Sequence, residues 1–287
     1  MERTKLPTFK GKPLIEITAP IPQIGYLEGE GNFGKAFLEE YQGKAKADYR
    51  NASALNVLSY SNGLVRGSNP FAVVLANQIL RQAGLRVATQ GELELAMKIG
   101  AMNFGGTYED TGLVLRTEDN PNEYLAKNLM TQIKARNKKQ KLPVMIPLAG
   151  LELRTDSNSP HGMTFSLRED SEIIYSPVLN KPGNFKSEDI DQKTGLPIKL
   201  SGGNRTLYTT NSGLSGLFLV SGLYLVSGSD NLALSFDYGR VVVVSTAEGG
   251  SQDFFNGKLA KLQKARDSQI AQINERYQRA EAVLIGK

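Results

Sequence analysis

Apolar side chains recur at helical spacing in the first half of the chain. One stripe, over residues 33–50, consists of Phe33, Phe37, Tyr41 and Ala45. A nearly continuous apolar run over residues 71–83 follows Pro70 and stops at Gly84. Proline at the first helical position and glycine just past the last are common helix boundaries, and an all-round apolar surface is typical of a buried helix. We therefore expect two helices here, the second of them central to the core.

Capping residues predict where helices begin. Ser, Thr, Asp and Asn accept hydrogen bonds from the free amides of a first turn, and a glutamate three residues later can complete a capping box. The expected caps are Ser68 or Asn69 for the buried helix, Thr89 with Glu92 for a second helix, and Asn120 for a third. The third helix is expected to run into a basic segment that ends at Lys141.

Short apolar runs bounded by turn residues predict strands, and they dominate after residue 150. We expect strands at residues 14–18, 55–60, 64–66, 111–115, 142–146, 151–154, 163–167, 172–175, 205–208, 216–221, 222–227 and 240–244. Asn62-Gly63 suits a tight hairpin turn between two of them. The polar stretch over residues 177–204 is expected to be a long loop.

Residues 216–221 and 222–227 are near-copies of each other at a period of six. A solenoid needs about three stacked repeats, so a meander of short buried strands is the expected structure. The surrounding residues 206–229 carry no charge. Their apolar core is nevertheless too short and too interrupted by glycine to cross a bilayer as a helix, and no membrane span is expected.

These patterns predict an α+β protein in three parts. Residues 1–150 form a mixed α+β domain, residues 151–250 a β-rich domain, and residues 251–287 an amphipathic C-terminal helix. The helix carries a heptad-like apolar stripe, which predicts an interface with another copy or another protein. The interface positions are Leu259, Leu262, Ile270, Ile273, Tyr277 and Leu284. Packing of the same stripe against its own chain is the alternative.

The composition excludes several kinds of chemistry. The chain has no cysteine and a single histidine, His161. Thiolate nucleophiles, thiolate metal sites and disulfides are therefore excluded, and we expect neither a cofactor nor a metal. His161 lies in a turn-rich loop, where we expect it to be exposed; a general base beside Asp156 is the alternative. No secretory signal is visible at the N-terminus, so a cytoplasmic location is expected.

Basic residues gather near the end of the third helix. The formal net charge is +5, which permits an acidic partner without requiring one. The candidate nucleic-acid-binding residues are Lys127, Lys134, Arg136, Lys138, Lys139 and Lys141. Such a cluster can neutralise phosphates, but cations at a helix C-terminus also complement the helix dipole without any ligand.

Acidic residues form several adjacent pairs that could supply acid–base chemistry. The pairs are Glu109-Asp110, Glu118-Asp119, Glu169-Asp170 and Glu188-Asp189, the last with Asp191 nearby. Each lies beside turn residues, where acids are common. Catalysis by two carboxylates would require them to converge in a cleft.

Three functions follow from these observations. The first is a non-catalytic interaction or assembly protein that self-associates, or docks a partner protein, through its β-rich part and C-terminal helix. The second is a nucleic-acid-associated protein that uses residues 127–141. The third is a carboxylate-based enzyme. We expect the first, and no catalytic residues.

If the terminal helix assembles copies of the chain, its removal abolishes assembly. We expect the full chain to have a larger mass by light scattering than a chain cut after Gly250, which should be monomeric. Two monomers would contradict self-association through this segment.

Overall fold

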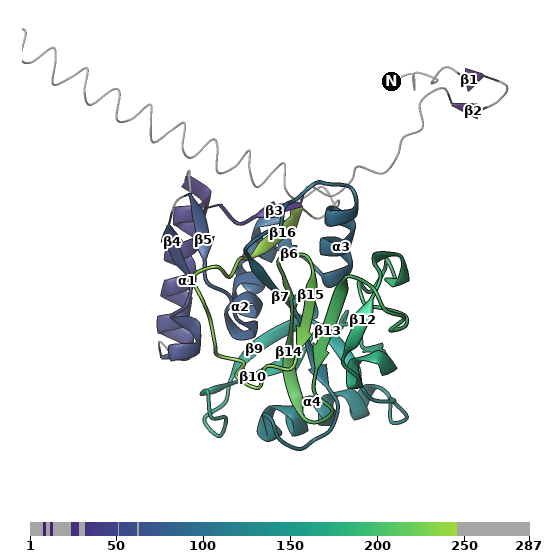
Figure 1. The fold of residues 1–287 in the computed structure, drawn as a ribbon. Coiled ribbons are helices and arrows are strands. Elements are labelled where there is room, and N and C mark those ends of the chain that lie inside the picture. The colour runs from purple at the N-terminus through teal and green to yellow at the C-terminus, as the bar shows by residue number, and fades with distance from the viewer. Residues whose placement is uncertain are drawn as a thin grey trace, which may run out of the picture.

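The computed structural model describes residues 8–9, 12–13, 24–28, 32–50, 52–61 and 63–245. Helices and strands occur together in them, so the α+β prediction is confirmed (Figure 1). The predicted C-terminal helix lies outside the described residues. The helices are α1 (Asn32–Tyr49), α2 (Pro70–Leu80), α3 (Gln90–Lys98) and α4 (Glu123–Arg136). Short 3-10 helices are η1 (Ser53–Leu55), η2 (Arg81–Ala83), η3 (Leu148–Gly150), η4 (Pro177–Asn180) and η5 (Ser187–Asp189).

Two of the three predicted caps are confirmed. The Asn69 side chain accepts a hydrogen bond from the amide of Ala72, and Thr89 forms the capping box with Glu92. The expectation for Asn120 is wrong, because α4 is preceded by Asn122 in a left-handed conformation with no side-chain cap. The Asn122 amide nitrogen instead donates to the carbonyl oxygens of Leu214 and Asp230, each at 2.8 Å. These contacts with distant segments fix the chain at this point and delay the helix.

A seven-stranded mixed sheet forms the centre of the molecule, in the order β11-β8-β7-β14-β15-β13-β12. All its neighbouring strands are antiparallel except β13 and β15. Its strands are β7 (Tyr108–Leu115), β8 (Val144–Pro147), β11 (Ile174–Tyr175), β12 (Gly183–Phe185), β13 (Arg205–Thr209), β14 (Leu214–Val220) and β15 (Tyr224–Ser227). Segments from both sides of residue 150 thus share one sheet, and β12 lies in the stretch expected to be a loop.

The remaining strands form smaller units. β3 (Ile24–Tyr26), β16 (Val242–Ser245) and β6 (Leu85–Val87) make a sheet with β16 in the middle, as its apolar sequence predicts. Three antiparallel pairs are β1 (Thr8–Phe9) with β2 (Lys12–Pro13), β4 (Ser59–Ser61) with β5 (Leu64–Arg66), and β9 (Leu151–Thr155) with β10 (Met163–Leu167). The β4–β5 pair is the predicted hairpin. No helix among the described residues is long and apolar enough to cross a membrane.

The two near-copies become the two strands of a hairpin. β14 turns at Ser221 and Gly222, both with positive φ, and returns as β15. β15 then lies between β14 and β13 and runs parallel to β13. β13 and β14 follow each other in the sequence but are therefore not adjacent in the sheet. The expected meander is replaced by the order β14-β15-β13, in which β15 lies between the other two strands.

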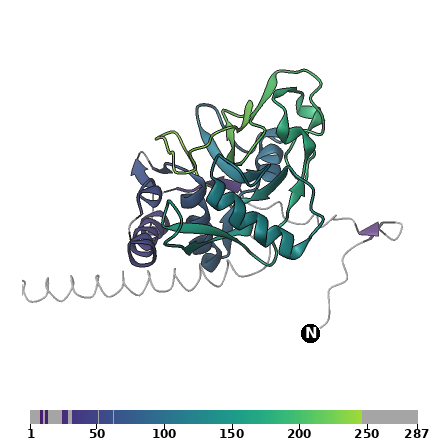
Figure 2. The same cartoon turned by 90° about the horizontal axis from the view of Figure 1, so that it is seen from below.

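Helices and loops cover the sheet unequally. α2 is buried along almost its whole length and packs with α1, α4 and the β9–β10 pair over one face. The other face packs against the 177–200 segment and α3. Figure 1 shows α1 and β12 at opposite sides of the molecule, and the view from below in Figure 2 brings α4 to the front.

A buried arginine joins several strand ends. Arg116 follows β7 and is 3% exposed. Its Nε donates to the Leu179 carbonyl at 3.0 Å, and its Nη atoms donate to the hydroxyls of Ser215 and Ser227 at 2.9 and 2.6 Å and to that of Thr209 at 2.5 Å. Burial lowers the pKa of Arg116 to about 10, so it remains a cation at neutral pH. No carboxylate pairs with it among the described residues, and carbonyl and hydroxyl dipoles stabilise its charge.

Replacing Arg116 tests this role. We expect Arg116→Met to lower the free energy of unfolding by about 3 kcal/mol or more, because several buried acceptors lose their donor at once. Arg154→Met, at an exposed position of β9, is the matched control and should change it by about 0.5 kcal/mol or less. Urea unfolding measures both. Equal stability of the two variants would contradict the role of Arg116.

Candidate functional site

One part of the central sheet has a face that none of the described helices covers. On the second half of β14 and on β15 and β13 the buried side chains alternate with partly or fully exposed ones, because neighbouring residues of a strand point to opposite faces. The uncovered side chains on these strands are Phe218, Val220, Tyr224, Val226, Thr206 and Tyr208. Tyr208 and Tyr224 are 50% and 37% exposed, and their rings lie 5.8 Å apart.

The segment over residues 229–239 crosses the β7 end of this face and is anchored there. The Tyr108 hydroxyl donates to the Ser68 carbonyl at 2.7 Å and accepts from the Phe236 amide at 3.0 Å. The Ser68 amide donates to the Ser235 hydroxyl at 3.0 Å. A Cβ at Gly239 would lie 2.7 Å from the Tyr108 ring, so glycine is required where the segment passes this tyrosine.

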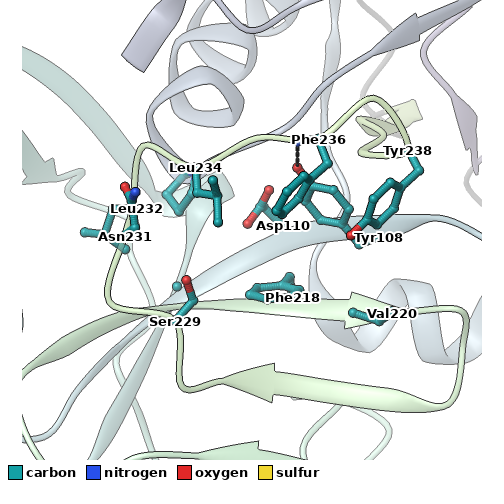
Figure 3. A pocket seen from close by; sticks show the side chains of 12 residues that line it. Tyr108, Asp110, Phe218, Val220, Ser229, Asn231, Leu232, Leu234, Phe236 and Tyr238 are labelled. Atoms are coloured by element: carbon teal, nitrogen blue, oxygen red, sulfur yellow. Dashed lines mark hydrogen bonds between the residues drawn. The ribbon is translucent and has the colours of Figure 1, made fainter. Parts of the chain in front are cut away.

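An aromatic hollow lies between this segment and the sheet (Figure 3). Its aromatic walls are Tyr108, Phe218, Phe236 and Tyr238, and Leu232 and Leu234 extend it. The Phe236 and Tyr238 rings stack at 5.4 Å, and the Tyr108 ring meets Phe218 edge-on at 5.7 Å. The cavity of about 60 Å³ exceeds what one water molecule needs, about 10–15 Å³. Phe236 and Tyr238 are 46% and 45% exposed, so a ligand can reach the rings.

A buried carboxylate lines the hollow. Asp110 is 9% exposed, and Figure 3 shows its carboxylate among Leu234, Phe236 and Tyr108. The Ser68 hydroxyl donates to its Oδ2 at 2.5 Å. Burial raises the pKa of Asp110 to about 7, and the hydrogen bond from Ser68 opposes that shift. Asp110 therefore exchanges a proton near neutral pH. Burial and the Asp110 charge raise the pKa of Tyr108 to about 12, so its phenol stays neutral.

Glu109 points away from the hollow. The residue is 1% exposed; its Oε1 accepts from the Tyr26 hydroxyl at 3.4 Å, while its Oε2 has no hydrogen-bond partner among the described residues. Burial raises its pKa to about 8. The sequence places this pair beside turn residues; in the structure both acids are buried within β7. The enclosed space that both of them line has only about 10 Å³, roughly the room for one water molecule, and two-carboxylate catalysis needs a cleft that admits a substrate.

A second cavity, of about 500 Å³, lies between α3, the 187–192 segment and the turn from β14 to β15. Its wall includes a buried ion pair, in which the Nη atoms of Arg205 donate to both Glu94 oxygens at 2.6 and 2.8 Å. Gln90 donates to Glu94 at 2.9 Å and accepts from Thr111 at 2.9 Å, which joins α3 to β7. The charges of Glu94 and Arg205 compensate each other, and the Arg205 Nε atom is enclosed rather than open to the cavity. The volume suits a ligand, but its chemistry is less specific than that of the aromatic hollow.

The predicted nucleic-acid-binding residues line neither cavity. Lys127 pairs with Glu123, Lys134 pairs with Glu118, and the Arg136 guanidinium donates to the carbonyls of Leu167 and Arg168. The remaining members of this group, all exposed, are Lys138, Lys139 and Lys141. Nearby acids and carbonyls thus engage half of the cluster, and its binding of nucleic acid stays a prediction. The predicted interface residues from Leu259 to Leu284 lie outside the described residues.

His161 does not line the hollow and adds no catalytic group to it. His161 is partly buried, with its ring centre 4.8 Å from that of Phe71, and burial lowers its pKa. The expectation of an exposed histidine is therefore wrong, because Phe71 lies against it. Asp156, its suggested partner, accepts a hydrogen bond from Tyr124. Within the described ranges, no group of three or more histidine or acidic side chains is placed to hold a metal ion.

Of the candidate acids, bases and cations named from the sequence, only Asp110 lines the hollow. The sequence nevertheless contains a further signal for it. Leu234, Phe236 and Tyr238 alternate at a two-residue spacing, as do Tyr108 and Asp110. Each alternation predicts one apolar or functional face of an extended segment. Neither predicts that the two faces meet.

Comparison with protein-family models, with curated proteins and with solved structures finds no match for this chain. Its function is therefore inferred from the geometry of the hollow and of the sheet beside it.

The raised pKa of Asp110 predicts a pH dependence of stability. The unfolded chain gives up this proton at a lower pH than the folded protein, so the contribution of Asp110 to stability falls as the pH rises from about 4 to 7. Asp110→Asn cannot ionise and should be more stable than the wild type at pH 8, by on the order of 4 kcal/mol, but not at pH 4. Urea unfolding at both pH values tests this. Asp230→Asn, at an exposed acid of the 229–239 segment that crosses the sheet, is the control. If Asp110→Asn is no more stable than the wild type at pH 8, the ionised Asp110 does not destabilise the folded protein and the prediction is wrong.

Proposed function

We propose that this protein is a non-catalytic binding protein and that its aromatic hollow takes an organic cation. The observation that carries the proposal is the buried carboxylate of Asp110 within walls made by four aromatic rings. Aromatic ring faces attract ammonium and guanidinium groups electrostatically, and removal of water strengthens the attraction. A carboxylate in the same hollow adds a charge-assisted hydrogen bond.

The unfavourable free energy of ionised Asp110 in the empty hollow supports a cationic ligand. In the empty hollow, burial favours the protonated acid, which carries no charge. A bound cation stabilises the carboxylate and lowers the pKa of Asp110, so binding is coupled to release of a proton near neutral pH. The ionisable groups that interact with Asp110 are Tyr108 and Glu109 on the same strand. Neither supplies a compensating positive charge.

The same geometry supports binding rather than catalysis. Among the residues that the structure describes, Asp110 and two tyrosines are the only ionisable side chains that line the hollow. A second carboxylate, a histidine or a nucleophile activated by a base is the usual minimum for acid–base or covalent catalysis. This matches the sequence-based expectation of an interaction protein that docks a partner through its β-rich part. The role of the C-terminal helix in assembly remains a separate prediction.

Binding of small cations tests the proposal. We expect choline and methylguanidinium to bind at pH 8 with dissociation constants of about 1–10 mM, as suits a few cation–π contacts and one charged hydrogen bond. Their neutral counterparts, 3,3-dimethylbutan-1-ol and methylurea, should bind at least about tenfold more weakly, a difference of about 1.4 kcal/mol. NMR titration of the tyrosine and phenylalanine ring signals measures both.

Variants locate the site. Asp110→Asn should weaken cation binding about tenfold, and lowering the pH to 5.5 should weaken binding to the wild type because Asp110 takes up a proton. Asp230→Asn should leave binding unchanged. Equal affinity for cations and neutral counterparts, or equal affinity of the wild type and Asp110→Asn, would refute the proposal.

A further inference from the structure

We infer that the cation is a basic side chain of a partner polypeptide, and that about four or five residues of that polypeptide lie across the open sheet face beside the hollow. This inference rests on the proposed function and extends it to the class of partner. Its basis is the arrangement of the exposed side chains on neighbouring strands, which continues away from the hollow.

The strand register places the side chains in two rows that cross the sheet. In the first row, Asp110 lies opposite Phe218, Phe218 opposite Val226, and Val226 opposite Tyr208. In the second row, Tyr108 lies opposite Val220, Val220 opposite Tyr224, and Tyr224 opposite Thr206. Both rows begin in the hollow on β7 and end on β13. The exposed face is therefore a continuation of the hollow and not a separate patch.

The two rows together form a band across the sheet, and the dimensions of this band fit a short extended peptide. Three strand-to-strand spacings of about 4.8 Å separate β7 from β13, so each row is about 14 Å long. An extended chain rises about 3.3 Å per residue, so four or five residues span the band. A small free cation would fill the hollow and leave the rest of the band uncovered.

The chemistry of the band selects a polypeptide with one cationic end. Asp110 is the only charged side chain among the eight in the two rows. The others are aromatic, aliphatic or hydroxyl-bearing, and exposed tyrosines are enriched where proteins bind each other. A peptide that places a lysine or an arginine in the hollow and uncharged residues along the band would complement both parts.

The charge distribution argues against a nucleic acid on this face. Exposed aromatic rings can stack on bases, but binders of single-stranded nucleic acid combine them with a positively charged groove. The two rows contain no lysine or arginine and one carboxylate. Phosphate groups would meet no counter-charge in them.

An array of capped five-residue peptides tests the inference. Each peptide carries lysine, trimethyl-lysine or arginine at one end and varied uncharged residues elsewhere. We expect the best peptides to bind the full chain at least tenfold more tightly than the corresponding capped single residue. Norleucine or citrulline in place of the basic residue should remove this binding, and so should Asp110→Asn.

Variants of the distant end of the band separate the two proposals. The double variant Tyr208→Ala and Tyr224→Ala should reduce peptide affinity to that of the single residue without changing the affinity for the single residue. Tyr60→Ala, at a 43% exposed tyrosine of β4, is the matched control and should change neither.

Each contrary result has a distinct meaning. If single residues bind through Asp110 but no peptide binds more tightly, the polypeptide inference fails and the proposed cation site stands. If neither binds, both fail. If an oligothymidine binds and the tyrosine double variant abolishes its binding, the face binds nucleic acid and the polypeptide inference is overturned.

Discussion

The hydrogen bonds of one buried guanidinium join three strands of the central sheet to η4. Arg116 reaches the carbonyl of Leu179 and the hydroxyls of Ser215, Thr209 and Ser227, which belong to η4, β14, β13 and β15. A planar group with five donors can connect this many acceptors, whereas an ammonium group cannot. An unpaired buried cation would be strongly destabilising. The charge is therefore stable only when these segments are assembled around it.

The strand order around Arg116 also creates the exposed face. Because β15 enters between β14 and β13, the rings of Phe218, Tyr224 and Tyr208 lie on one face of three neighbouring strands, with Phe218 and Tyr208 in one row and Tyr224 in the next. At the other end of β13, the ion pair of Arg205 with Glu94 attaches α3 to the opposite face of the sheet. The sheet is thus covered by α3 and the 177–200 segment on one side. On the other side, from β14 to β13, none of the described helices covers it.

In the hollow, the buried negative charge of Asp110 lowers the stability of the folded protein. Asp110 has no cationic partner among the described residues, and its pKa of about 7 measures the disadvantage of the ionised form. Burial of such a group is typical of functional sites, where the arrangement serves a ligand rather than the fold. Glu109 has the same disadvantage on the opposite face of β7, but it does not line the hollow. Because of this contrast between adjacent residues, the proposed ligand is placed at Asp110 alone.

The sequence alone determined most of the local elements. The apolar stripes, the caps at Asn69 and Thr89, the stop at Gly84 and the Asn-Gly hairpin were all predictable, because each depends on residues within a few positions of one another. The start of α4 was not, because contacts of Asn122 with Leu214 and Asp230 decide it. Only the tertiary structure decided which strands are neighbours, that Glu109 and Asp110 are buried, and that Tyr108 meets Phe236. Those facts depend on contacts between residues about a hundred positions apart, such as the hydrogen bond from the Phe236 amide to Tyr108, and periodicity along the chain carries no information about such pairings.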